Sequence, residues 1–94
     1  GMGDLCRACR QDVYLEGVLP VALEALESNP MAGEMYDGEL MSSLEHIRQS
    51  RWMEMPGERE ACLRILMLIE PGTLDVDVVA NFASLKQKLG ESQG

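Results

Sequence analysis

Residues 15–28 read LEGVLPVALEALES, and the fold can be worked out from this stretch outward. Its apolar residues recur every three or four positions, which is the spacing of one face of an α-helix. Pro20 lies inside the stretch, so either a short turn ends before it or one helix continues across it with a kink. We expect one kinked helix, because the apolar stripe stays in phase on both sides of Pro20. The stripe consists of Leu15, Val18, Leu19, Ala22, Leu23 and Leu26.

The segments on either side of this stretch also have helical spacing. A helix is expected over residues 4–12, with Leu5, Ala8, Cys9 and Val13 on its inward face. After residue 28, Asn29-Pro30 ends the long helix, because a residue before proline avoids the α conformation. An irregular loop should then run from Met31 to Gly38, since it holds two glycines. The next helix should be capped by Asp37, with four inward residues: Leu40, Met41, Leu44 and Ile47.

The second half of the chain predicts two further helices. The third helix fades near residues 49–50, and Trp52 should pack back on the core from a short turn. Pro56 opens a helix that Pro71-Gly72 ends. Thr73 or Asp75 then caps a last helix, and residues 90–94 are expected to fray. The inward residues of these two helices should be Ala61, Cys62, Ile65, Leu66, Ile69, Val76, Val79, Phe82, Ala83 and Leu89.

These segments predict an all-α fold: a single small helical bundle of about four to five helices over residues 1–94. A chain of 94 residues suits one domain. Gly1 before Met2 looks like a remnant of tag removal. The longest strongly apolar run, Ile65 to Ile69, is far below the roughly 20 residues that span a bilayer. No signal peptide is recognisable, and an odd, small number of cysteines, Cys6, Cys9 and Cys62, fits a reducing cytoplasm.

The charge is placed unevenly along the chain. Sixteen acids against eight bases give a formal net charge of −8, which argues against a nucleic-acid partner because phosphate binding needs a basic surface. Between Gln11 and Ile47 there are eight acids and no Lys or Arg, so this stretch carries the whole net charge. Such a block repels itself and favours association with a basic protein, although a merely solvated acidic face is the alternative.

Catalytic and metal-binding interpretations of the sequence are weak. Cys6 and Cys9 have the spacing of a redox or zinc motif, but no second pair completes it, and two buried small residues on a helix explain them better. His46 is the only histidine, and no nucleophile or phosphate-binding motif accompanies it. We therefore expect no enzyme activity, no cofactor and no metal. The loop end Tyr36-Asp37-Gly38-Glu39 is the strongest candidate site, with core packing and capping as the alternative.

The first half of the chain contains, in order, Asp4-Leu5, Gln11, Leu15, Val18-Leu19-Pro20-Val21-Ala22-Leu23, Leu26, Asn29-Pro30, Gly33, Tyr36, Gly38-Glu39-Leu40 and Trp52. In this order and spacing, these residues resemble the immunity proteins of bacterial contact-dependent growth inhibition (CDI). The chain departs from the family pattern at Asp37, where proline is expected, at Glu39, where aspartate is expected, at Met41, where leucine is expected, and at Cys6, where arginine is expected. Further residues before Asp4 would also be expected.

The resemblance implies a small helical protein that binds and neutralises a cognate toxin domain. Many such toxins are nucleases with basic active sites, which an acidic surface would complement. An acidic adaptor or regulatory module without a toxin partner is the alternative, and self-association stays open. A neighbouring gene for a large secreted toxin would separate the two. The residues expected to contact the partner are Glu24, Glu27, Glu34, Tyr36, Asp37 and Glu39.

Overall fold

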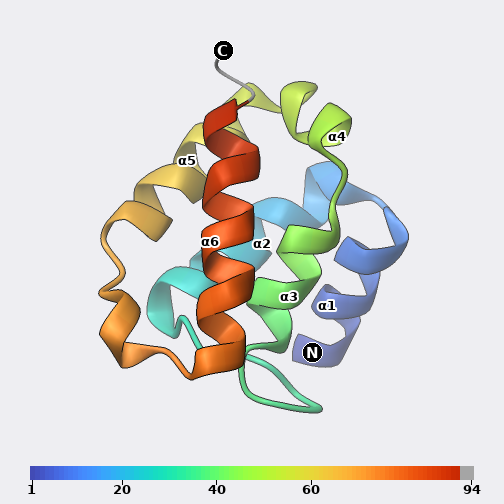
Figure 1. The fold of residues 1–94 in the computed structure, drawn as a ribbon. Helices are drawn as coiled ribbons and strands as arrows, with labels where there is room; N and C mark the ends of the chain where they lie inside the picture. Colours follow the sequence, from blue (N-terminus) through green and yellow to red (C-terminus); the bar gives the residue numbers. More distant parts are fainter. Residues whose placement is uncertain (92–94) are drawn as a thin grey trace.

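The structure is a computed structural model, and it describes residues 1–91. Within these residues the protein folds into a bundle of six α-helices and one short 3-10 helix (Figure 1). The all-α prediction is confirmed, but the expected number of four to five helices was too low. The additional helix is α4, which forms where a short turn was expected and buries Trp52. The elements are α1 (Met2–Gln11), α2 (Leu15–Ser28), α3 (Glu39–His46), α4 (Gln49–Met53), α5 (Pro56–Met67), η1 (Pro71–Thr73) and α6 (Val76–Glu91).

Helix α2 runs without interruption across Pro20, as the phase of its apolar stripe predicted. Pro20 is exposed, so the carbonyl of Glu16 that lacks its usual N–H partner lies on the solvent side, where water can bond it. The helix ends at Ser28, and its C-cap residue Asn29 has an extended backbone, as expected for a residue before proline. Five residues of the predicted stripe are buried, namely Leu15, Leu19, Ala22, Leu23 and Leu26.

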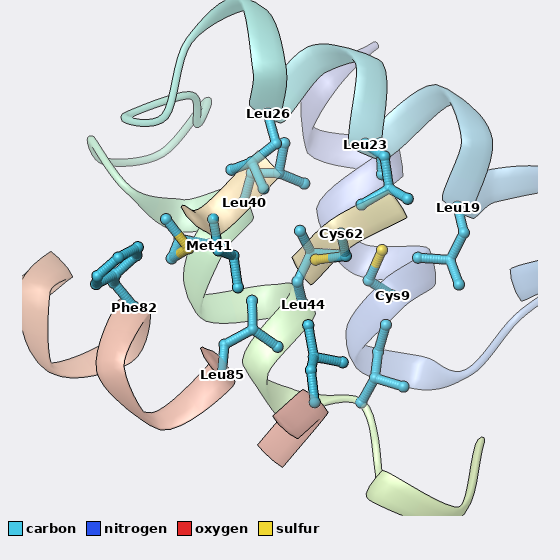
Figure 2. Close-up of a cluster of buried hydrophobic side chains, with 14 of the residues drawn as sticks. Cys9, Leu19, Leu23, Leu26, Leu40, Met41, Leu44, Cys62, Phe82 and Leu85 are labelled. Atoms are coloured by element: carbon cyan, nitrogen blue, oxygen red, sulfur yellow. The ribbon is translucent and has the colours of Figure 1, made fainter. Parts of the chain in front are cut away.

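Helix α3 lies at the centre of the molecule, between α1 and α6 (Figure 1). Its buried residues Leu40, Met41 and Leu44 meet side chains from α2, α5 and α6 in one core (Figure 2). Figure 2 shows Met41 turned towards Phe82 and Cys9 beside Cys62. Because α3 packs against α1, α2 and α6, the loop that precedes it is connected directly to a helix of the core.

The inward faces of the first and last helices differ from the prediction. In α1 the fully buried residues are Cys6 and Cys9, while Leu5 and Ala8 are only half-buried. In α6 the expected inward residues Val76 and Ala83 are exposed, and Val78 and Leu85 are buried instead. In each helix apolar residues also lie next to the predicted stripe, and the packing against α3 determines which of them turn inward.

The ends of several helices also differ from expectation. Helix α5 begins at Pro56 as predicted, but it ends at Met67 rather than at Pro71, which opens η1 instead. Helix α6 continues to Glu91, and the rest of the segment expected to fray lies outside the described residues. Helix α1 begins at Met2, two residues before the expected start. Within residues 1–91, no helix is both long enough and apolar enough to cross a membrane.

Candidate functional site

The α2–α3 loop, residues 29–38, has a defined shape although it contains no regular element. The side-chain oxygen of Asn29 accepts a hydrogen bond from the backbone N–H of Met31 at 3.0 Å, which starts the turn after α2. Ala32 is buried, and its carbonyl accepts the N–H of Leu40 at 3.0 Å. The loop is therefore bonded back to the first turn of α3, and its outer part, residues 34–37, is held outward.

The side chain of Glu39 holds this loop in place through hydrogen bonds to its backbone. Its Oε1 accepts the backbone N–H groups of Glu34 and Met35, each at 2.9 Å, and its Oε2 lies 3.2 Å from Nη1 of Arg10. The same Arg10 nitrogen donates to the hydroxyl of Ser43 at 3.0 Å. The Met35 and Glu34 N–H bonds, helped by Arg10, lower the pKa of the Glu39 carboxyl. Glu39 is thus an ionised side chain that fixes the loop.

At two positions the loop can hold only glycine, because a side chain would collide with neighbouring atoms. A Cβ at Gly33 would overlap the carbonyl oxygen of Tyr36 and lie 2.8 Å from Cβ of Glu39. Gly38 is the N-cap residue of α3 with φ of 88°, and a Cβ there would overlap Cγ2 of Val78 at the start of α6. The prediction that Asp37 caps α3 is wrong, because Gly38 holds that position and no side chain caps the helix.

The outer part of the loop presents two acidic and two large apolar side chains to solvent. Met35 is 79% exposed and Tyr36 is 55% exposed, while Glu34 and Asp37 flank them. The only hydrogen bond of these acid side chains in residues 1–91 is from the N–H of Gly3 to Glu34, at 3.4 Å. Adaptable apolar side chains beside unpaired charges are typical of protein-binding surfaces.

The tertiary structure neutralises one part of the acidic block and leaves the other part free. Basic residues outside the block form ion pairs with some of its acids. Arg48, the N-cap residue of α4, and Arg51 of α4 both pair with Asp12, and Lys88 of α6 pairs with Glu45. Glu16 lies 3.5 Å from Arg51, and Glu39 has Arg10. Within the described residues, four acids of the block take part in no ion pair: Glu24, Glu27, Glu34 and Asp37.

The six residues predicted to contact a partner fall into three places. Glu34, Tyr36 and Asp37 share the outer part of the loop. Glu24 and Glu27 are exposed along α2, before the loop. Glu39 does not belong to the exposed surface, since its side chain is 3% exposed and its oxygens already have partners. What Glu39 determines directly is the shape of the loop, through its bonds to the Glu34 and Met35 N–H groups.

Arg10 is the residue of this site that the sequence did not indicate. It lies on α1, 29 residues before Glu39, so only the packing of α1 against α3 brings them together. No spacing in the sequence predicts such a pair. The exposed Met35, by contrast, could be suspected from its place in a loop without an apolar periodicity.

The other residues considered for chemistry take no part in this loop. Burial raises the pKa of Cys9 and of Cys62 to about 12, and burial also raises the pKa of Cys6, so all three stay as thiols. They are free cysteines in the core, as their helical spacing suggested. His46 is exposed at the end of α3. No group of three or more metal-ligating side chains in residues 1–91 is arranged to hold a metal ion.

The fold and the loop together define a small all-helical protein with a shaped, unpaired acidic surface. A comparison with protein families gives a match over residues 1–62 of 94, which includes α1 to α4, the whole α2–α3 loop and the first half of α5. The matching family is described as CDI immunity proteins, and the chain belongs to it. No curated protein is similar enough in sequence to count as a match.

Proposed function

We propose that this protein neutralises a cognate toxin domain by binding it, without any chemistry of its own. The outer part of the α2–α3 loop, with Glu34, Tyr36 and Asp37, forms the contact surface, and Glu24 and Glu27 extend it along α2. One observation carries the proposal: the acids of the block that take part in no ion pair within residues 1–91 coincide with this exposed loop and the outer face of the adjacent helix. Family membership supports the immunity role.

Charge determines which kind of toxin surface would fit. Unpaired like charges on one surface repel one another, which costs the isolated protein some stability. A basic face on the toxin removes that repulsion and raises the rate of association. A toxin that acts on a nucleic acid needs such a basic face to hold phosphates. We therefore infer that the surface covers the phosphate-binding side of a basic toxin domain.

The apolar side chains give the same surface a second contribution. Charged groups at the edge of an interface mainly steer association, whereas the slow step of dissociation depends on well-packed apolar anchors. Tyr36 and Met35 are exposed between Glu34 and Asp37 and supply that area. The Glu39 bonds hold their backbone before binding, so less ordering is needed when the complex forms.

The test uses the double variant E34K/D37K, with the single charge reversal E60K as a control outside the loop. Glu60 is also exposed, outside any ion pair of the described residues, and lies on α5 rather than in the loop. The partner is the toxin domain encoded beside this gene or captured from the host. We expect E34K/D37K to weaken binding about tenfold or more, mostly through slower association, and to flatten its salt dependence. The E60K control should change the affinity little.

Two outcomes contradict the proposal. Unchanged affinity of E34K/D37K for a basic toxin domain would remove the loop from the interface. A captured partner that is not a toxin, together with no protection of growing cells, would favour an acidic adaptor. Growth protection by the wild-type chain and its loss in E34K/D37K is the expected result.

A further inference from the structure

A groove between α2 and the segment after α5 is apolar over most of its surface. Its volume is about 320 Å³, and Leu26, Pro30, Ile65 and Leu68 line it together with two acids, Glu27 and Glu70. Leu68 is 81% exposed, so a large apolar side chain at the edge of the groove is in contact with water. The groove therefore leaves apolar surface in water that a bound side chain could cover.

The two acids of this groove come from different parts of the chain. Glu27 belongs to α2 and Glu70 precedes η1, and both side chains are exposed. Neither takes part in an ion pair within residues 1–91. The nearby base Arg64 lines a separate hollow with Glu60, which also borders Leu68. The groove thus combines apolar walls with two carboxylates that lack a cation.

We propose that this groove receives a lysine or arginine side chain of the toxin domain. The inference rests on the proposed function and adds a defined position to it. The long aliphatic stem of such a side chain would lie against Leu68 and Pro30, and its charged head would meet Glu27 and Glu70. This occupant covers the apolar walls and neutralises both carboxylates at once.

Other occupants fit the groove less well. A wholly apolar side chain would remove water from Glu27 and Glu70 without supplying a partner, which is unfavourable for charged groups. A second copy of this chain would bring another formal charge of −8 towards an already acidic surface. Charge complementarity therefore selects a basic partner over self-association.

The position of the groove connects it to the α2–α3 loop. Pro30 lines the groove and is also the second residue of the loop, so one partner surface can reach both. Leu68 and Glu70, however, lie beyond the family match, which covers residues 1–62. The structure thus assigns part of the recognition of an individual toxin to the C-terminal third of the chain.

The probe for this site is N-acetyl-L-arginine amide, with N-acetyl-L-citrulline amide as its neutral isostere. Each is titrated into the whole ¹⁵N-labelled chain, and backbone amide shifts are followed by NMR. We expect saturable shifts centred on Glu27, Leu68 and Glu70 with the arginine amide and none with the citrulline amide. The variant E27Q/E70Q should weaken the association constant about fourfold to twenty-fivefold, because each of two exposed ion pairs is worth about twofold to fivefold.

The control variant is D77N, since Asp77 is also exposed and takes part in no ion pair within residues 1–91, but it lies on α6 and does not line the groove. Its association constant should equal that of the wild type. Equal shifts with the citrulline amide, or equal weakening in D77N and E27Q/E70Q, would overturn the inference. Because the titration contains no toxin, its result is separate from the loop test. If the arginine amide does not bind the groove but toxin binding still depends on Glu34 and Asp37, the groove proposal is wrong and the proposed function stands.

Discussion

Replacing Gly38 by alanine should destabilise the whole bundle, because two separate costs meet at this position. The backbone at Gly38 has φ of 88°, and an L-residue in the left-handed region loses about 1–2 kcal/mol relative to glycine. The new Cβ would also overlap Cγ2 of Val78 and lie 3.4 Å from its Cγ1. Overpacking of this kind costs about 1–3 kcal/mol. The sum is at least about 2 kcal/mol of unfolding free energy.

The assay is thermal and urea unfolding followed by circular dichroism. For a domain of this size, 1 kcal/mol corresponds to about 4–8 °C in Tm, so G38A should melt about 8 °C or more below the wild type. G57A is the matched control: Gly57 lies in α5, and a Cβ added there would have no neighbouring atom within 4 Å. An exposed Gly→Ala change in a helix is neutral or stabilises by up to about 1 kcal/mol.

A double-mutant cycle separates the two costs at Gly38. In a V78A background the overlap is relieved, so G38A should then cost only the backbone contribution of about 1–2 kcal/mol. An equal cost of G38A in both backgrounds would show that the contact with Val78 is not what excludes a side chain. A Tm of G38A within about a degree or two of the wild type would refute both costs together.

Two further predictions concern titratable groups in the core and under the loop. The pKa of Glu39 is lowered in the folded state, so its contribution to stability is present above its ordinary value of 4.5 and is lost as the pH falls through the lower folded value. The stability difference between wild type and E39Q should therefore shrink below that pH in urea melts, and a gap independent of pH would contradict the assigned bonds. Cys6, Cys9 and Cys62 should react with Ellman's reagent at about pH 8 only after unfolding, because burial raises their pKa values. Rapid labelling of the folded protein would show that at least one thiol is accessible.

The position of the loop in the chain could be predicted from the sequence, but the hydrogen bonds that hold its shape could not. The loop follows from local signals, since Asn29-Pro30 stops a helix and two glycines interrupt the apolar periodicity. Its exposed acids followed from counting charges. The role of Glu39 did not, because a carboxylate in the first turn of a helix looks like any other acid at a helix start. Only the structure shows that its two oxygens face the loop amides and Arg10.

The helices could be located from the amino-acid order alone, because helix formation depends on spacing, proline and glycine within a few residues. That is why the buried stripe of α2 and the start of α5 at Pro56 were correct. Which acids stay unpaired depends instead on how the helices pack. Asp12 meets Arg51 across 39 residues and Glu45 meets Lys88 across 43, and no local pattern specifies such pairs. The acids of the block that this packing leaves without an ion pair in residues 1–91 are the ones that we propose for partner binding.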